Sequence, residues 1–312
     1  MAGDDDGWDD PSEILPNLYL SGVEAAENAD ILKRLGITHI ITVDIAPLDP
    51  QPVANYLFIR ANDMPAQDLM SFFPQVMDFI ESALNGGDDN KVLIHCVMGM
   101  SRSATMMVAY VMKFKHLSAV DAITLVESKR PIVCPNQGFR EQLNVWEQCN
   151  FQIDVACRDY RNICLRDLLE KIRRAQPTDE SVIPMDAFKE YLNKLRHDQE
   201  SINNGNSYKC RKCRLFLFKE INVIVDEPYE AKQTELDRCE AIFVEPMEWM
   251  LQGFNSNQYE GLVNCPRCLS KLGGYHWSKL ECFTREMKKC TRHASIAPAF
   301  KLDMRKVDCH QH

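Results

Sequence analysis

One stretch of the sequence restricts the fold more than any other. An apolar run at 91–94 ends in His95 and Cys96, a short loop containing one glycine follows, and an apolar helical pattern covers 104–114. A strand, a glycine-containing loop and a helix N-terminus in this order direct backbone N–H groups toward one point, where the helix adds partial positive charge. The stretch therefore predicts a cradle for a tetrahedral anion such as phosphate. The residues expected to bind the anion are Val97, Met98, Gly99, Met100, Ser101 and Arg102.

Three side chains of this stretch make the predicted binding site reactive. A cysteine at a helix N-terminus beside a cation can have its pKa lowered from about 8.5 to roughly 3.5–7.5, so Cys96 is expected to be a thiolate nucleophile at neutral pH. The planar guanidinium of Arg102 can bind two phosphate oxygens, and Ser103 can donate to the sulfur and help it leave. Cys134 and Arg140 also stand six residues apart, but no apolar strand precedes them.

The pattern His95-Cys96-x-x-Gly99-x-Ser101-Arg102-Ser103 resembles the signature of the cysteine-dependent dual-specificity protein phosphatases. The resemblance covers about residues 14–151, with 17–22 at its start and 135–139 near its end. It implies a cysteine-dependent phosphatase fold, in which helices flank a central sheet. It also implies that phosphotyrosine, phosphoserine and phosphothreonine are hydrolysed through a cysteinyl-phosphate intermediate, with no cofactor in catalysis.

A leaving alkoxide or phenolate also needs a proton, which a carboxylic acid on a loop above the cradle can supply. From the sequence alone, the candidate acids are Asp44, Asp49, Asp63 and Asp68. The resemblance selects Asp63, which follows a predicted strand at 56–60. It also assigns Asn136 to bracing of the phosphate loop. His95 either helps to keep the thiolate charged through local hydrogen bonds or is a structural histidine at a strand end.

The loop residues also bear on the substrate. Apart from Arg102, the loop carries no lysine or arginine, whereas a polyphosphate would favour several cations there. A single phosphoryl group on a protein is therefore the expected substrate. No long insertion builds deep walls, so we expect a shallow pocket that accepts all three phosphorylated residue types.

Strands alternate with helices in this part of the chain, which predicts an α/β layer structure with catalytic residues at the carboxyl ends of strands. The predicted strands cover 18–20, 38–43, 56–60 and 91–94, and the predicted helices cover 28–35, 72–84 and 104–114.

The last third of the chain contains a second strong pattern. Cys210-x-x-Cys213 and Cys265-x-x-Cys268 each present paired thiolates, and two such pairs complete a tetrahedral zinc site. Enough ligands remain for a second four-coordinate site, namely Cys239, Cys282, Cys290 and His293. We therefore expect one or two structural zinc ions in a small β-rich domain. A closed thiolate site has no open position for catalysis.

This region resembles the dual-specificity phosphatase twelve (Yvh-type) group. The matching residues are 210–213, Cys239, 243–246, 249–250, 265–268, 271–273 and 297–300. The segment 281–294 is longer than the group's close cysteine pair, which makes His276 an alternative ligand. The resemblance implies two roles: dephosphorylation of phosphoproteins such as stress-activated MAP kinases, or binding of the zinc domain to preribosomal particles during large-subunit maturation, with catalysis secondary. Scattered basic residues give the zinc domain local positive charge; these are Arg285, Lys288, Lys289, Arg292, Lys301, Arg305 and Lys306.

Composition and charge limit the remaining possibilities. The net charge of −9 over 312 residues argues against a histone-like polyanion binder, although a local basic patch is compatible with it. No apolar run reaches the roughly 18 residues of a membrane span. The acidic N-terminus lacks the features of a secretory signal, and 13 cysteines without such a signal are typical of metal binding and catalysis. We therefore expect a monomeric cytoplasmic and nuclear protein. Its predicted parts are an acidic tail (1–13), a catalytic domain (14–153), a helical connector (154–207) and a zinc-binding domain (208–312).

Overall fold

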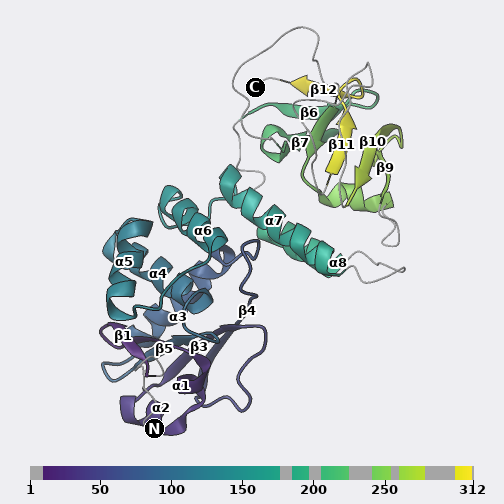
Figure 1. The fold of residues 1–312 in the computed structure, drawn as a ribbon. Coiled ribbons are helices and arrows are strands. Elements are labelled where there is room, and N and C mark those ends of the chain that lie inside the picture. The colour runs from purple at the N-terminus through teal and green to yellow at the C-terminus, as the bar shows by residue number, and fades with distance from the viewer. Residues whose placement is uncertain are drawn as a thin grey trace. The chain divides into compact units, whose positions relative to one another are not determined.

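The computed structural model describes residues 10–175, 185–196, 205–224, 241–253, 260–277 and 299–310. The chain forms two compact units, Met1–Ile163 and Cys164–His312 (Figure 1). Helix α7 (Arg158–Arg174) begins in the first unit and ends in the second. Most of the predicted acidic tail lies outside the described residues.

The first unit contains a five-stranded sheet. In spatial order its strands are β1 (Ser12–Leu15), β2 (Leu18–Ser21), β5 (Val92–His95), β3 (His39–Asp44) and β4 (Asn55–Arg60). Strand β1 is antiparallel to β2, and all other neighbours are parallel. The four strands predicted from the sequence are confirmed, whereas no strand was predicted at β1.

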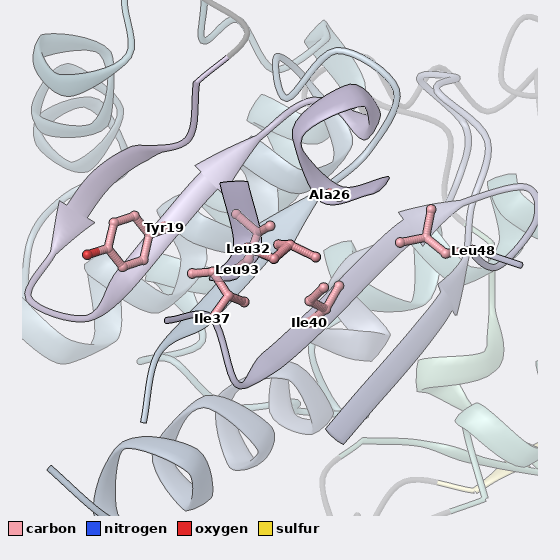
Figure 2. Packing of buried hydrophobic residues seen from close by; sticks show 7 residues of the cluster. All are labelled: Tyr19, Ala26, Leu32, Ile37, Ile40, Leu48 and Leu93. Carbon is pink, nitrogen blue, oxygen red and sulfur yellow. The ribbon is translucent and has the colours of Figure 1, made fainter. Parts of the chain in front are cut away.

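Helices flank the sheet of the first unit, some in direct contact with its strands and others packed on those helices. They are α1 (Val23–Glu27), α2 (Ala29–Leu35), η1 (Met70–Phe72), α3 (Phe73–Asn85), α4 (Arg102–Lys115), α5 (Ala119–Lys129) and α6 (Gln137–Gln148). Tyr19, Leu93 and Ile40 form one row across β2, β5 and β3 and pack with Ala26 and Leu32 of α1 and α2 (Figure 2). The alternate residues of these strands face the opposite side, and α4, buried throughout its first eleven residues, contacts β2, β3 and β5.

The parallel strands all end at the same edge of this sheet. Strand β2 leads to Gly22, β3 ends in Asp44, β4 leads to 61–63, and β5 leads to Cys96. In an α/β sheet this carboxyl edge is where ligands bind. The expected α/β architecture, with helices flanking a central sheet, is confirmed, and it brings residues far apart in the sequence to one place.

The second unit is rich in β-structure. Its elements after α7 are α8 (Met185–Lys194), β6 (Ser207–Cys210), β7 (Phe216–Lys219), η2 (Glu220–Asn222), β8 (Ala241–Val244), η4 (Glu248–Gly253), β9 (Glu260–Asn264), β10 (Lys271–His276), β11 (Ala299–Asp303) and β12 (Val307–His310). They include a four-stranded sheet, β8-β11-β10-β9, and a three-stranded sheet, β12-β6-β7. Buried Trp277 packs edge-on against Phe188 of α8 at 5.8 Å and Phe300 of β11 at 5.3 Å between ring centroids. None of the helices in the described parts of the chain has the length and apolarity needed to cross a bilayer.

Candidate active site and metal site

Cys96 lies where β5 passes into the loop that precedes α4, and its side chain is buried. Its Sγ accepts a hydrogen bond from the Gly99 N–H at 3.3 Å and another from the Ser103 hydroxyl at 3.1 Å. Hydrogen bonds to the charged form of a group favour that form. Gly99 has a φ of 67°, and a Cβ at this position would collide with the carbonyl of Ser21. Glycine is therefore required for the loop to bring this N–H to the sulfur.

Arg102 opens α4 and is buried at the same edge of the sheet. Its Nη1 donates to Asp44 Oδ1 at 2.7 Å and to the Ala61 carbonyl at 3.4 Å. Asp44 is itself held in place, because its Oδ1 also accepts the N–H of Ile45 at 2.7 Å. Within the described part of the chain, the buried Nε of Arg102 has no hydrogen-bond acceptor. One edge of the guanidinium is thus fixed, while the Nε is a donor suited to an anionic ligand.

Asp63 follows β4 and lies beside the cradle. Its Oδ1 accepts hydrogen bonds from the Ser101 hydroxyl at 2.7 Å and from Asn136 Nδ2 at 2.8 Å. Its Oδ2 lies 3.8 Å from Arg102 Nε, and 39% of the side chain remains exposed. A carboxyl group that is both fixed and accessible can exchange a proton with a bound ester or with water.

The other candidate acids are placed differently. Asp44 is engaged by Arg102. Asp68 is fully buried and accepts the Ser71 N–H at 3.0 Å. Asp49 is exposed in the loop between β3 and β4. The geometry therefore favours Asp63 as the proton donor.

Asn136 connects α6 to both the loop and the acid. As the N-cap of α6, its side chain accepts the Phe139 N–H at 3.1 Å. Its backbone N–H donates to Ser101 Oγ at 3.3 Å, in addition to the bond from its side chain to Asp63. Asn136 thus braces the loop through Ser101 and orients Asp63.

His95 is fully buried at the end of β5. Its Nε2 lies 2.6 Å from Thr42 Oγ1, and its Nδ1 lies 3.3 Å from the Cys96 carbonyl oxygen. Because a carbonyl oxygen only accepts, Nδ1 carries the proton and Nε2 accepts from Thr42. Burial lowers the pKa of His95 to about 4, so the ring is neutral at pH 7. His95 acts on Cys96 through its backbone hydrogen bond and not through a positive charge.

The two CxxC pairs meet in the second unit. The sulfur atoms of Cys210, Cys213, Cys265 and Cys268 all lie within 4.8 Å of one another. Each sulfur contacts one from the other pair, with Cys213 3.5 Å from Cys265 and Cys210 3.7 Å from Cys268. Hydrogen bonding to the Ser270 side chain lowers the pKa of Cys268 to about 6, whereas burial raises the pKa of Cys265 to about 12, so without a metal ion the thiolate is favoured at Cys268 and the thiol at Cys265. Four convergent sulfur donors form a site that can hold a soft divalent metal ion.

The two halves of this site share one backbone pattern. The Cys210 N–H donates to the carbonyl of the residue five positions ahead, and the Cys265 N–H does the same. Arg214 and Leu269, the residues that follow each pair, both have left-handed φ angles, 61° and 56°. The second set of expected ligands, Cys239, Cys282, Cys290 and His293, lies outside the described residues. The alternative ligand His276 belongs to β10 and is not part of the four-sulfur group.

Comparisons with known proteins bear on both units. Residues 18–149 match the family model of the dual specificity phosphatase catalytic domain. Tyrosine-protein phosphatase yvh1 of Schizosaccharomyces pombe is 30% identical over 280 residues, which cover 89% of this chain and 80% of that protein. This chain belongs to the Yvh1 family of dual-specificity phosphatases. Mouse dual specificity protein phosphatase 12 is 28% identical over 315 residues, or 95% of this chain and 87% of that protein. The MAP kinase phosphatase with leucine-rich repeats protein 3 of Dictyostelium discoideum is 42% identical over 155 residues, which cover 49% of this chain and 17% of that protein.

Sequence reasoning missed two polar residues of this Yvh1-family phosphatase. Asp44 was considered only as an acid, yet it holds Arg102. Its position at the end of a strand next to β5 is the signal that identifies it, since parallel strands deliver their carboxyl ends to one edge. Arg130, the C-cap of α5, donates hydrogen bonds to loop carbonyls. Its local sequence carries no comparable signal.

Proposed function

We propose that this phosphatase hydrolyses phosphotyrosine, phosphoserine and phosphothreonine in proteins through phosphorylated Cys96. The observation that supports this most strongly is the pair of hydrogen bonds that Cys96 Sγ accepts from Gly99 and Ser103, in a loop that ends at Arg102, the first residue of α4. Donors arranged in advance around a sulfur and an anion site are what phosphoryl transfer requires.

In the first step Cys96 Sγ attacks phosphorus, a P–S bond forms and the P–O ester bond breaks. Asp63 gives its proton to the departing oxygen, and Arg102 binds the oxygens of the transferred group. In the second step Asp63 takes a proton from water, whose oxygen attacks phosphorus. The P–S bond then breaks, and the hydrogen bond from Ser103 stabilises the leaving thiolate.

The rim of the cradle favours a protein substrate over a polyphosphate. Four large apolar residues near the loop are exposed to solvent: Ile45 (57%), Val97 (47%), Met98 (59%) and Met100 (36%). Apolar side chains at the rim suit the residues that flank a phosphorylated position, whereas a polyphosphate would require cations. Stress-activated MAP kinases are our proposed substrates, and the name of the Dictyostelium relative supports the broader class of MAP kinases. We place this activity in the cytoplasm and nucleus.

A substrate trap tests the enzymatic proposal. The double variant Asp63→Ala, Cys96→Ser is expected to bind phosphorylated kinase peptides without releasing phosphate, while the wild type releases phosphate from all three residue types. The same peptides without phosphate are the control. Equal recovery of phosphorylated and unphosphorylated peptides, or phosphate release by Cys96→Ser at the wild-type rate, would count against the proposal.

We propose that the four-cysteine group holds zinc with a structural role. Closed tetrathiolate sites suit Zn²⁺ and stabilise small domains on binding. A second ion bound by Cys239, Cys282, Cys290 and His293 remains a proposal from the sequence. Zinc content per chain, measured by atomic emission, distinguishes one ion from two.

A second candidate function is docking of the zinc-binding unit on a preribosomal particle. A hollow of about 420 Å³ beside the cysteine group supports it. Five cationic side chains contribute to its lining: Arg211, Lys212, Lys271, Arg305 and Lys306. Asp303 is the one acidic residue in the lining described here, and it is paired with Arg305 at 2.9 Å. Such a basic hollow on an acidic protein suits a nucleic-acid phosphate backbone.

Charge reversal tests this second function. Replacing Lys212, Lys271 and Lys306 by Glu is expected to abolish salt-sensitive binding to purified preribosomal particles and to leave phosphatase activity unchanged. Lys33→Glu, at an exposed position of α2 in the catalytic unit, is a control for charge reversal away from the hollow. Undiminished binding by the triple variant would rule out the hollow as the docking site.

A further inference from the structure

Arg130 is a fully buried arginine at the end of α5, with an exposed fraction of 1%. Its Nη2 donates to the Met98 carbonyl at 3.1 Å, and its Nε donates to the Gly99 carbonyl at 3.2 Å. These are two successive carbonyl groups of the phosphate loop. The planar guanidinium, with several donors in fixed directions, can hold two neighbouring peptide groups at once, which a lysine cannot do.

The Met98 carbonyl belongs to the same peptide plane as the Gly99 N–H. In a trans peptide the C=O and the N–H point in opposite directions. Arg130 therefore binds one side of this plane, while the other side donates the 3.3 Å hydrogen bond to Cys96 Sγ. A chain of contacts runs from the guanidinium through one peptide group to the nucleophile.

The next peptide plane, between Gly99 and Met100, is oriented by Arg130 in the same way. Because Arg130 holds the Gly99 carbonyl, the N–H of Met100 points away from the guanidinium. Carbonyl oxygens are partial negative charges, so an anion site requires them to face outward. A cation bound to them also polarises the peptide groups and makes their N–H groups stronger donors.

The guanidinium is anchored on its other side as well. Its Nη1 lies 3.4 Å from the Asp10 carbonyl oxygen and 3.4 Å from Ser12 Oγ, where β1 begins. The side chain is thus held by the N-terminal strand region and by the loop together. Because the guanidinium lies on the carbonyl side of these peptide planes, it does not contact a phosphate bound on their N–H side.

We propose that Arg130 is a positioning residue for phosphoryl transfer, which fixes the peptide planes of Met98 and Gly99 so that their N–H groups face the Cys96 sulfur and the bound phosphoryl group. It acts through the loop and does not touch substrate. This inference rests on the proposed function for its catalytic consequence, but its effect on anion binding and on the thiol can be measured independently of turnover.

The test compares Arg130→Met and Arg130→Lys with Arg161→Met in the full-length protein. Arg161 is a suitable control because it is also buried and donates to a backbone carbonyl, that of Val155 at 2.9 Å, away from the loop. The readouts are the pH dependence of Cys96 alkylation by iodoacetamide, inhibition by inorganic phosphate, and kcat and KM. The charged groups Arg102, Asp44 and Asp63 and the neutral His95 are the same in all variants. Circular dichroism establishes which variants are folded.

We expect Arg130→Met to move the midpoint of alkylation to higher pH and to weaken phosphate inhibition and kcat by roughly 10- to 100-fold, the effect of lost hydrogen bonds around a charged group. Arg130→Lys should be intermediate, because it keeps the charge and loses the fork, and it provides the folded variant if the Met substitution does not fold. Arg161→Met should leave all three readouts unchanged.

Wild-type alkylation and phosphate inhibition in a folded Arg130 variant would overturn the inference. If the wild type releases no phosphate from any phosphopeptide, the proposed function fails by itself. The alkylation and phosphate readouts would still decide the role of Arg130, so the two failures are distinguishable.

Discussion

The buried His95 ring makes the stability of the catalytic unit depend on pH in a way that can be worked out from the structure. Burial holds the pKa of His95 at about 4, below its ordinary value of 6.5. The unfolded chain therefore takes up a proton at this residue before the folded chain does. Stability is complete above pH 6.5 and is lost as pH falls from 6.5 toward 4. The difference between the two pKa values corresponds to about 3 kcal/mol in total, of which about 2 kcal/mol is lost between pH 7 and pH 5.

His95→Asn removes this titration, since Asn carries no proton that binds in this range. The variant loses the Thr42 contact and is less stable at pH 7, but the gap between it and the wild type is expected to narrow by about 2 kcal/mol at pH 5. The carboxylates titrate in both proteins, so their effect cancels in the comparison. His116→Asn is the control: His116 is exposed with a φ of 53°, which Asn tolerates.

The assay is hydrogen exchange of β5 and α4 peptides during urea unfolding at pH 7 and pH 5. This readout reports the catalytic unit in a chain of two compact units. If the wild type and His95→Asn lose stability in parallel between these pH values, His95 titrates as an exposed histidine and the reasoning about its burial is refuted.

Three further predictions concern the acid, the loop and the metal site. Asp63→Asn should lower kcat by about 10²–10⁴-fold for phosphoserine peptides and much less for p-nitrophenyl phosphate, whose leaving group needs no proton; equal losses would contradict its role as acid. Gly99→Ala should abolish activity and destabilise the fold by more than the control variant Gly36→Ala. Gly36 has a φ of 72° but no neighbouring atom that a Cβ would meet, so its replacement should lower the free energy of unfolding by about 1 kcal/mol in chemical denaturation. Equal destabilisation by the two variants would mean that the collision with Ser21 at the loop does not matter. Cys268→Ser should lower zinc content and destabilise the second unit in thermal scans, whereas Cys309→Ser, outside the four-sulfur group, should change neither.

The cradle was predictable because its parts are contiguous. Cys96, Gly99, Arg102 and Ser103 lie in one strand–loop–helix stretch, so local patterns of apolar and glycine residues fix their neighbourhood. The CxxC pairs were predictable for a related reason. Thiolate pairs have few structural uses other than metal binding, and the structure brings the distant pairs together.

The supporting contacts were not predictable, because they join residues far apart in the sequence. Arg102 and Asp44 are 58 positions apart, and His95 and Thr42 are 53 positions apart. Their contact depends on β3 lying beside β5, and periodicity predicts a strand without predicting its neighbours. Strand β1 has the sequence Ser-Glu-Ile-Leu and buries only Ile14, so it lacks the continuous apolar run by which β2 and β5 were recognised.

The phosphorylated cysteine itself is the most direct test of the central claim. Ser103→Ala removes the hydrogen bond to Cys96 Sγ that stabilises the leaving thiolate, so the intermediate should accumulate during turnover. Rapid acid quenching followed by intact-protein and peptide mass spectrometry is expected to find one phosphoryl group, bound at Cys96. Turnover with no phosphorylated cysteine in this variant, or with the phosphoryl group on another residue, would contradict the account.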